Sequence, residues 1–382
     1  MKTWLTASVR RLISGAAIAL LIVARTADAQ QGPGAPPHTV APKMAPHPSA
    51  DPDGTVGVGG EAVPFSSFAS LQARKAFIAK LSAPQPAEGS DIAALRRFYG
   101  KYNDALAARM KARYAVNIKA TTINGVAVEI VTPDTGVPPA NRHRVLINLH
   151  GGAFMWGEGS GGEVEAIPIS SLGRIRVITV AYRQGPENVF PAASQDVASV
   201  YQALLRDYKP NNIGIYGCSA GGILAAESVA WLQKEGLPIP GAIGTFCGSA
   251  SEFTGDSLHL SPPITGDPAG VPLSDTGLVL SLPYFRGASP KDPLVFPTNS
   301  PTVLAHFPPT LLIAGSRDFS LSSLFYTQEQ LVKAGVTAEL HVWDGLWHAF
   351  FVDPDLPESQ EAYAVIVNFF QHHLGDRTPL GH

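Results

Sequence analysis

A glycine-flanked serine lies in the middle of the 382-residue chain, in the pentapeptide Gly-Cys-Ser-Ala-Gly at 217–221, centred on Ser219. A short apolar run, 213–216, precedes it, and an apolar helical pattern, 223–231, follows it. Strand, tight turn and helix are the context in which Gly-x-Ser-x-Gly forms a nucleophile elbow, which holds a serine hydroxyl at a sheet edge and a helix N-terminus. The pentapeptide alone also fits an ordinary glycine-rich turn, so other residues must decide.

A serine hydroxyl is a weak nucleophile at neutral pH, so it needs a base to take its proton and a carboxylate to orient that base. After an elbow serine, the acid and then the histidine follow in the chain. Asp318 comes soon after the apolar run 310–314, and His348 comes soon after the run 338–342. Since ligands and reacting groups gather at the carboxyl ends of parallel strands, both side chains are predicted to reach Ser219.

Other acids and histidines are less well placed for these two roles. Two of the acids share a loop with His348, which makes it hard for either to reach the far nitrogen of its ring, and a third lies in a long irregular segment. One histidine falls inside a predicted strand and two fall on the last predicted helix. These alternatives are Asp344, Asp353, Asp292, His341, His372 and His373.

A second glycine-containing segment, His-Gly-Gly-Ala-Phe at 150–154, follows the apolar run 144–149. Hydrolases place such a loop after a strand, where its backbone N–H groups bind the oxyanion of the reaction intermediate. The N–H of the residue after the nucleophile, here Ala220, joins them. His150 is interpreted as an organiser of this loop and not as the base.

Short apolar runs separated by helical patterns occupy the chain from residue 144 onward. In most of these runs apolar residues follow one another directly, instead of occupying every second position, which is typical of strands buried on both faces. The pattern therefore predicts a parallel sheet covered by helices on both faces, which is an α/β fold. The predicted strands are 144–149, 176–180, 213–216, 242–246, 310–314 and 338–342, and a last helix is predicted at about 358–374.

Three further segments complete the expected organisation. Apolar residues at three- and four-residue steps predict helices between 65 and 115, the second of them capped by Ser90 or Asp91. The run 121–131 holds Asn-Gly, the strongest short-range hairpin signal. The Pro- and Gly-rich segment 251–308 is too long for a simple connection and is expected to pass over the active-site edge.

Together these segments resemble the hormone-sensitive-lipase-like branch of the α/β-hydrolases, the bacterial esterases of that type. The resemblance covers roughly residues 114–374, and it implies a mostly parallel eight-stranded sheet, helices on both faces and an N-terminal helical cap. It also implies oxyanion donors at Gly152, Ala153 and Ala220, with Gly151 counted in the same loop. The matching residues are 150–154, the run 181–192 with Asp196, the run 217–222, Asp318 and His348.

Four positions depart from the pattern of that branch. Cys218 stands where Asp or Thr is usual before the nucleophile, and Ala153 replaces the third glycine of the loop. Ser322 replaces a second carboxylate four positions after the catalytic one, and Ala349 follows the histidine where glycine is frequent. None of these changes removes a catalytic group, and together they indicate an outlying subgroup.

The resulting functional hypothesis is a serine carboxylesterase that hydrolyses short- to medium-chain esters through an acyl-enzyme, without a cofactor or metal. The same site could open a lactone, and a fold of this kind could also act as a non-catalytic binding protein. Four apolar residues near the loop are candidates either for a substrate pocket or for core: Phe154, Met155, Trp156 and Tyr182.

Composition narrows the class of protein further. A net charge of −3 and a pI near 6.4 provide no basic surface for nucleic acid, so a small-molecule ester is the expected partner. The only cysteines, Cys218 and Cys247, follow buried-looking runs, which favours two free thiols over a disulfide without excluding the disulfide.

The N-terminus has the pattern of a secretory signal peptide. Basic residues precede an apolar run at 12–24, and Ala-Asp-Ala at 27–29 offers a cleavage site before Gln30. The run is shorter than the ~20 residues that span a bilayer, so the mature chain is predicted to be exported without a membrane span. The expected divisions are a signal peptide at 1–29, a Pro/Gly/Ala-rich leader at 30–61, a helical cap at 62–118 and a catalytic domain at 119–376.

Overall fold

The computed structural model describes residues 48–87, 89–267 and 277–375. The chain divides into two compact units, and the described residues belong to the second, Ala45–His382. The predicted signal peptide and most of the predicted leader, up to residue 47, lie outside the described residues.

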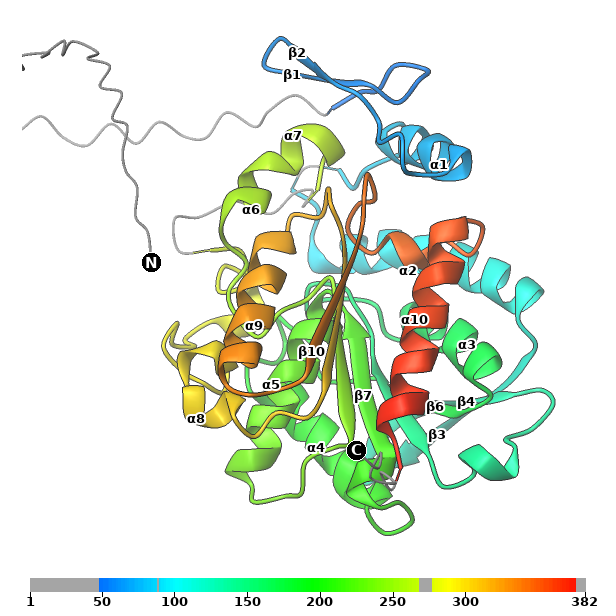
Figure 1. Cartoon of the computed structure of the whole chain (residues 1–382), viewed down its shortest axis with the longest axis vertical. Helices are drawn as coiled ribbons and strands as arrows, with labels where there is room; N and C mark the ends of the chain where they lie inside the picture. Colours follow the sequence, from blue (N-terminus) through cyan, green and yellow to red (C-terminus); the bar gives the residue numbers. More distant parts are fainter. Residues whose placement is uncertain (1–47, 88, 268–276, 376–382) are drawn as a thin grey trace, which may run out of the picture. The chain divides into compact units, whose positions relative to one another are not determined.

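An eight-stranded sheet is the framework of this unit (Figure 1), with the strand order β10-β9-β8-β7-β5-β6-β4-β3. The pairs from β10 to β6 are parallel, and β4 pairs antiparallel with both β6 and β3. The α/β fold with a mostly parallel sheet is therefore confirmed. The strands are β3 (Val116–Ile123), β4 (Val126–Pro133), β5 (Val145–Leu149), β6 (Arg176–Val180), β7 (Ile213–Cys218), β8 (Ala242–Phe246), β9 (Thr310–Gly315) and β10 (Ala338–Trp343).

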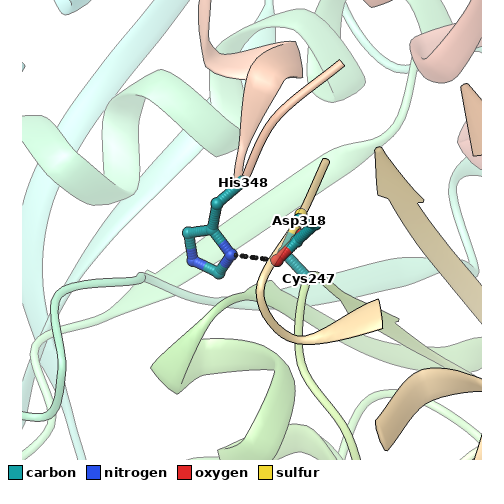
Figure 2. A group of neighbouring side chains, drawn as sticks. All are labelled: Cys247, Asp318 and His348. Atoms are coloured by element: carbon teal, nitrogen blue, oxygen red, sulfur yellow. Dashed lines mark hydrogen bonds and ion pairs between the residues drawn. The ribbon is translucent and has the colours of Figure 1, made fainter. Parts of the chain in front are cut away.

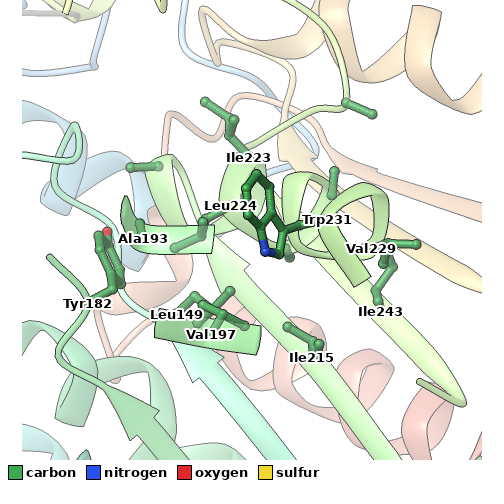
Figure 3. Packing of buried hydrophobic residues seen from close by; sticks show 14 of the residues in the cluster. Leu149, Tyr182, Ala193, Val197, Ile215, Ile223, Leu224, Val229, Trp231 and Ile243 are labelled. Atoms are coloured by element: carbon green, nitrogen blue, oxygen red, sulfur yellow. The ribbon is translucent and has the colours of Figure 1, made fainter. Parts of the chain in front are cut away.

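Alternate residues of the central strands enter different hydrophobic clusters, because both faces of the sheet are covered. Ile147 of β5 packs in a cluster with α4 (Ala192–Leu204) and α5 (Ala220–Lys234), whereas the adjacent Leu146 packs with α3 (Ser160–Gly173) and α10 (Pro357–His373). Figure 3 shows part of the first cluster, where residues of α5 meet residues of β7 and β8. Beside it, α9 (Leu321–Lys333) packs on β9 and β10.

Two helices precede the sheet, as the apolar spacing predicts. They are α1 (Leu71–Leu81) and α2 (Ile92–Arg113). Asp91, not Ser90, caps α2, because its carboxylate accepts the Ala94 N–H at 2.7 Å. Since α2 packs chiefly on α3, this region covers the second cluster.

Residues 48–61 differ from the expected leader, because the structure folds them. β1 (Val56–Val58) and β2 (Glu61–Val63) form an antiparallel pair, and Val56 is fully buried in the second cluster. Strands of three residues provide too few positions for a readable period, which is why the composition concealed this pair.

The predicted hairpin at Asn-Gly is confirmed as the connection between β3 and β4. Asn124 and Gly125 both have positive φ, 47° and 82°, which is the requirement of a two-residue type I′ turn. The flanking residues Ile123 and Val126 are opposite each other in the ladder.

In the described part of the long segment after β8, the α-helices are short: α6 (Asp256–Leu260), α7 (Pro262–Thr265) and α8 (Pro301–Leu304). Two of its aromatic residues, Tyr284 and Phe285, pack against Phe154, with ring centroids 4.8 and 5.0 Å away. The segment therefore reaches the 150–154 loop. Within the described ranges, no helix is both long and apolar enough to cross a bilayer.

Candidate active site

The backbone at Ser219 has the strained conformation of an elbow, with φ 57° and ψ −120°. The flanking glycines are required by space, because a Cβ at Gly217 or Gly221 would lie 2.1 or 1.7 Å from the carbonyl oxygen of Leu149. Ser219 N–H donates to the Phe246 carbonyl at 2.7 Å, which anchors the turn to the end of β8. The side chain of Ser219 thereby stands at the N-terminus of α5.

The three residues predicted to act together lie in one hydrogen-bonded chain. His348 Nε2 is 2.9 Å from Ser219 Oγ, and His348 Nδ1 is 2.9 Å from Asp318 Oδ1. Asp318 follows β9 and His348 follows β10, so both come from the carboxyl ends of neighbouring parallel strands. The ring of His348 also stacks on Phe319 at 4.3 Å, which restricts its rotation. This arrangement can remove a proton from the serine hydroxyl.

Asp318 is fully buried, yet it is held as a carboxylate. Burial alone would raise the pKa of Asp318, but the charge of His348 and hydrogen bonds from His348 and Ser320 hold the pKa below its ordinary value. Ser320 supplies both its backbone N–H, at 2.8 Å, and its hydroxyl, at 2.7 Å, to the oxygen that faces His348. Ser320 was not predicted from the sequence, although its position two residues after the acid is typical of an Asx turn.

The alternative acids have other partners. Asp344 accepts hydrogen bonds from the hydroxyls of Ser66 and Ser316, Asp353 pairs with Arg109, and Asp292 accepts the Leu294 N–H. The alternative histidines are also elsewhere: His341 and His373 lie near Glu339, and His372 is on α10.

The 150–154 loop has an unusual backbone with three positive φ angles in succession, 120° at Gly152, 52° at Ala153 and 56° at Phe154. Among the described residues, the N–H groups of Gly152, Ala153 and Ala220 donate to no acceptor, so they are free to bind an oxyanion. The N–H of Gly151 differs, because it donates to Glu165 at 2.9 Å.

His150 organises the loop, in agreement with its predicted role. Its ring stacks on Tyr182 at 4.2 Å, and its Nδ1 lies 2.8 Å from the Gly151 carbonyl oxygen. Burial lowers the pKa of His150 to about 4, so the ring is neutral at physiological pH. The Tyr182 hydroxyl donates to the His150 carbonyl at 2.7 Å and closes this small network.

The four residues proposed for a substrate pocket separate into two groups. Phe154 and Tyr182 are 0% and 1% exposed and pack within the first cluster, so the core interpretation fits them. Trp156 is partly exposed and stacks face to face on Tyr99 of α2, with the ring centroids 4.4 Å apart and an angle of 4° between the ring planes. Met155 is buried and its carbonyl accepts from an arginine of α2.

That arginine is Arg96, and it fastens α2 to the active-site edge. Its guanidinium donates to the carbonyls of Met155 and Gly185 at 2.9 and 2.8 Å and pairs bidentately with Glu187. A planar guanidinium suits this set of acceptors better than an ammonium would. The helical cap predicted from the sequence is therefore joined to the loop by a residue that carried no motif.

Cys247 was also missed as a neighbour of the site (Figure 2). Its sulfur, an Asp318 oxygen and a His348 nitrogen lie within 4.8 Å of one another, and it accepts the Ala349 N–H at 3.2 Å. Cys218 and Cys247 are both free and buried, and burial raises the pKa of each thiol. A neutral thiol is a poor metal ligand, and Asp318 and His348 are already bonded to each other. Cys247 thus supports the backbone next to His348.

Three of the four departures from the family pattern have a visible structural consequence. Ala349 has φ 55°, and Ala153 has φ 52°, so alanine occupies left-handed positions that glycine adopts without strain. Ser322 exchanges hydrogen bonds with Ser257, at 2.9 and 3.0 Å, and so ties α9 to the segment after β8.

A hollow of about 440 Å³ lies away from this chemistry. Its lining includes Arg144 and Arg176, which precede or begin β5 and β6, whereas the candidate catalytic residues follow the opposite ends of the strands. The hollow is therefore no substrate site for Ser219.

Comparison with known proteins agrees with this geometry. Residues 146–352, more than half of the chain, match a family model described as alpha/beta hydrolase fold. The chain is 27% identical to an acetyl-hydrolase of Streptomyces hygroscopicus over 246 residues, which are 63% of this chain and 80% of that protein. It is 29% identical to an esterase of Acinetobacter venetianus over 235 residues, 60% of this chain and 75% of that protein.

Solved structures are similar over a larger part of the chain. One esterase superposes with a TM-score of 0.71 at 31% identity, covering 84% of this chain and 99% of its own. An esterase from the bacterial hormone-sensitive lipase family superposes with a TM-score of 0.64 at 25% identity, covering 78% of this chain and 96% of its own.

Proposed function

This chain belongs to the α/β-hydrolase family and, within it, to the hormone-sensitive-lipase-like esterase branch, so it is a carboxylic ester hydrolase. We propose that it works as a serine carboxylesterase on short- to medium-chain esters, through an acyl-enzyme. The observation that carries this proposal is the hydrogen-bonded sequence Ser219 Oγ, His348 Nε2, His348 Nδ1, Asp318 Oδ1, with both contacts at 2.9 Å.

In the first half of the reaction, His348 takes the proton of Ser219 as the hydroxyl oxygen attacks the ester carbonyl. The carbonyl oxygen becomes an oxyanion, which the unengaged N–H groups of Gly152, Ala153 and Ala220 bind. His348 then gives its proton to the departing alcohol, which leaves the acyl group on Ser219.

In the second half, a water molecule replaces the alcohol and His348 acts again as the base. The buried carboxylate of Asp318 stabilises the imidazolium in both halves and keeps Nδ1 protonated. Apart from the ester and the water, all of these steps use groups of this chain.

The name of one relative and the packing of the 150–154 loop support a preference for small acyl groups. The relative from Streptomyces hygroscopicus is named an acetyl-hydrolase. On the 150–154 loop, the buried Phe154 packs against the rings of Tyr284 and Phe285, so the space beside this end of the loop is filled with aromatic rings. A long straight acyl chain needs an open groove at such a position, and a short chain does not.

The test is hydrolysis of p-nitrophenyl esters from acetate to palmitate by the wild-type protein and by Ser219→Ala. We expect the highest kcat/KM between acetate and hexanoate, and a fall of about 10⁶-fold in kcat for the variant. Cys218→Ala is a matched control, because it changes the adjacent buried residue and leaves the hydroxyl in place. Equal turnover by Ser219→Ala would refute the serine mechanism, and a maximum at palmitate would refute the chain-length proposal.

We also propose that the protein is exported, on the basis of the basic residues, the apolar run 12–24 and the Ala-Asp-Ala at 27–29. The N-terminal residue of the mature protein tests this, with Gln30 expected. A mature chain that begins with the first methionine would contradict it.

A further inference from the structure

One buried acid of the active-site region takes no part in the proposed reaction. Glu165 lies in the second turn of α3 and is 7% exposed. A carboxyl group in such a place is costly unless hydrogen bonds compensate for the lost water. The partners of Glu165 therefore show what it holds in position.

Those partners come from the two backbone segments that form the oxyanion site. Glu165 Oε1 accepts the N–H of Gly151 at 2.9 Å, and Oε2 accepts the N–H of Cys218 at 3.1 Å. Gly151 directly precedes the donors Gly152 and Ala153, and Cys218 lies two residues before the donor Ala220. One carboxyl group thus joins the 150–154 loop to the elbow.

The position of this bridge along the sheet explains the need for it. β5 and β7 are paired in parallel up to Leu149 and Gly217, and there the ladder ends. Beyond that pair, one chain turns into the loop and the other into the elbow. The two segments nevertheless stay close to each other. A Cβ added at Gly151 would lie only 3.1 Å from the Cys218 carbonyl oxygen. The carboxyl of Glu165 supplies the next hydrogen-bonded connection after the last pair of the ladder.

We propose that Glu165 is a positioning residue for ester hydrolysis, whose carboxyl fixes the distance between the oxyanion donors of the 150–154 loop and the donor at Ala220. This inference rests on the proposed function, since it concerns the oxyanion of that reaction. The packing of α3 does not require the carboxyl, because Val164, Ile167 and Ile169 anchor the helix in the second cluster.

A neighbouring amide lets the bridge persist in both protonation states. Asn148 Nδ2 donates to Glu165 Oε2 at 3.0 Å, while the buried Asn148 Oδ1 has no partner among the described residues. If the amide turns over, Oδ1 takes the place of Nδ2 and accepts the proton of a neutral Glu165. The backbone N–H groups of Gly151 and Cys218 keep their acceptors in either state.

Burial raises the pKa of Glu165 to about 8, against the effect of its three hydrogen-bond donors. The phenols of Tyr182 and Tyr216 and the thiol of Cys218 respond to its charge, and the ring of His150 lies beside Gly151 at one end of the bridge. Burial and the charge of Glu165 raise the pKa of the two phenols and of the thiol, whereas burial lowers the pKa of His150. All four groups are therefore uncharged near neutral pH. Ionisation above pH 8 consequently places an unbalanced negative charge beside the oxyanion site and slows the reaction.

The experiment compares Glu165→Leu and Glu165→Gln in the full-length enzyme. Leucine keeps much of the volume and offers no acceptor, so we expect kcat to fall about 100-fold with KM within about threefold, as for loss of an oxyanion donor. Glutamine has one acceptor oxygen, so it can hold the N–H of Gly151 or of Cys218 but not both, and we expect a loss of about tenfold. The inhibition constant of phenylboronic acid, which mimics the tetrahedral intermediate on Ser219, should rise by similar factors.

The matched control is Glu163→Gln, on the same helix, because Glu163 pairs with Lys111 and not with the active site. Its kcat should equal that of the wild type. Between pH 7 and pH 9.5 the wild-type kcat should fall at least threefold, and the kcat of Glu165→Gln should stay level.

A folded Glu165→Leu within threefold of wild-type kcat would overturn the proposal, as would a loss that appears in KM alone. If Glu165→Leu fails to fold, Glu165→Gln decides: wild-type kcat together with the wild-type alkaline fall would overturn the proposal. Failure of the proposed function is distinguishable, because the wild-type enzyme would then turn over no ester.

Discussion

Asp318→Asn isolates the contribution of one buried charge, because Ser320 dictates how an asparagine must sit. Oδ1 of Asp318 receives the Ser320 N–H, the Ser320 hydroxyl and His348 Nδ1, while the buried Oδ2 has no partner among the described residues. An amide NH₂ in the place of Oδ1 would face the backbone N–H of Ser320. The asparagine carbonyl must therefore take that place, and His348 keeps the tautomer that leaves Nε2 free to accept the serine proton.

The expected loss is then electrostatic. Two charges about 4 Å apart attract each other by about 4 kcal/mol at an effective dielectric constant of about 20. Losing that attraction to the imidazolium corresponds to a fall of about 10³-fold in kcat, since 1.36 kcal/mol is tenfold. Where an amide turns the other way and imposes the wrong tautomer, the fall is about 10⁴-fold. Asp318→Ala, which loses both charge and orientation, should fall at least tenfold further than Asp318→Asn.

The assay is kcat on p-nitrophenyl butyrate for both variants and the wild type, with near-UV circular dichroism as the check of folding. The reasoning is refuted if a folded Asp318→Asn loses less than tenfold, because the carboxylate would then contribute little. It is also refuted if the two variants lose equally, because Ser320 would then not orient the amide.

Three further substitutions probe the elements that position these residues. Arg96→Ala should raise KM about tenfold and leave kcat within about threefold, because it releases α2 from the carbonyls of Met155 and Gly185. The measurement is Michaelis kinetics on the hexanoate ester, and an unchanged KM would show that this attachment is unimportant. Gly221→Ala should cost more than about 4 kcal/mol of unfolding free energy or prevent folding, because its Cβ would lie 1.7 Å from the Leu149 carbonyl oxygen. Gly100→Ala, where nothing lies within 4 Å of the new Cβ, should instead stabilise α2 by about 0.5–1 kcal/mol, and equal melting temperatures for the two variants would contradict this.

The sequence predicts the sheet well, because its parallel strands are uniformly apolar and are punctuated by helices. β6 and β8 have the predicted ends, and β7 extends only to Cys218 beyond its predicted last residue at 216. The β1–β2 pair was not predicted, since three-residue strands in a glycine-rich segment have no measurable period. Motifs identify candidate reacting groups, and here they led to Ser219, Asp318 and His348, where His348 is within hydrogen-bond distance of each of the other two.

Motifs are less informative about groups that position others. Glu165 and Arg96 act through contacts with backbone atoms from distant parts of the chain, and no local pattern in the sequence encodes such contacts. Ser320 differs, because it donates to the Asp318 carboxylate only two residues before it. A signal was nevertheless available for Glu165. It interrupts an apolar helical stretch at 164–169 that reads as core, and a lone acid in a core stretch requires hydrogen-bond partners.

The distance between the loop and the elbow is determined first by the absence of side chains. Gly217 and Gly221 both face the carbonyl oxygen of Leu149, which is therefore the point where the end of β5 touches the elbow without an intervening Cβ. A contact made only of backbone atoms cannot be adjusted by repacking, because nothing in it can change rotamer. The same constraint does not act at Ala153. There the energetic cost of having alanine in place of glycine comes only from the backbone strain of its own left-handed φ of 52°. The chain can therefore accept alanine for the third glycine of the loop at a cost of about 1–3 kcal/mol, whereas the glycines of the elbow cannot be replaced without moving β5.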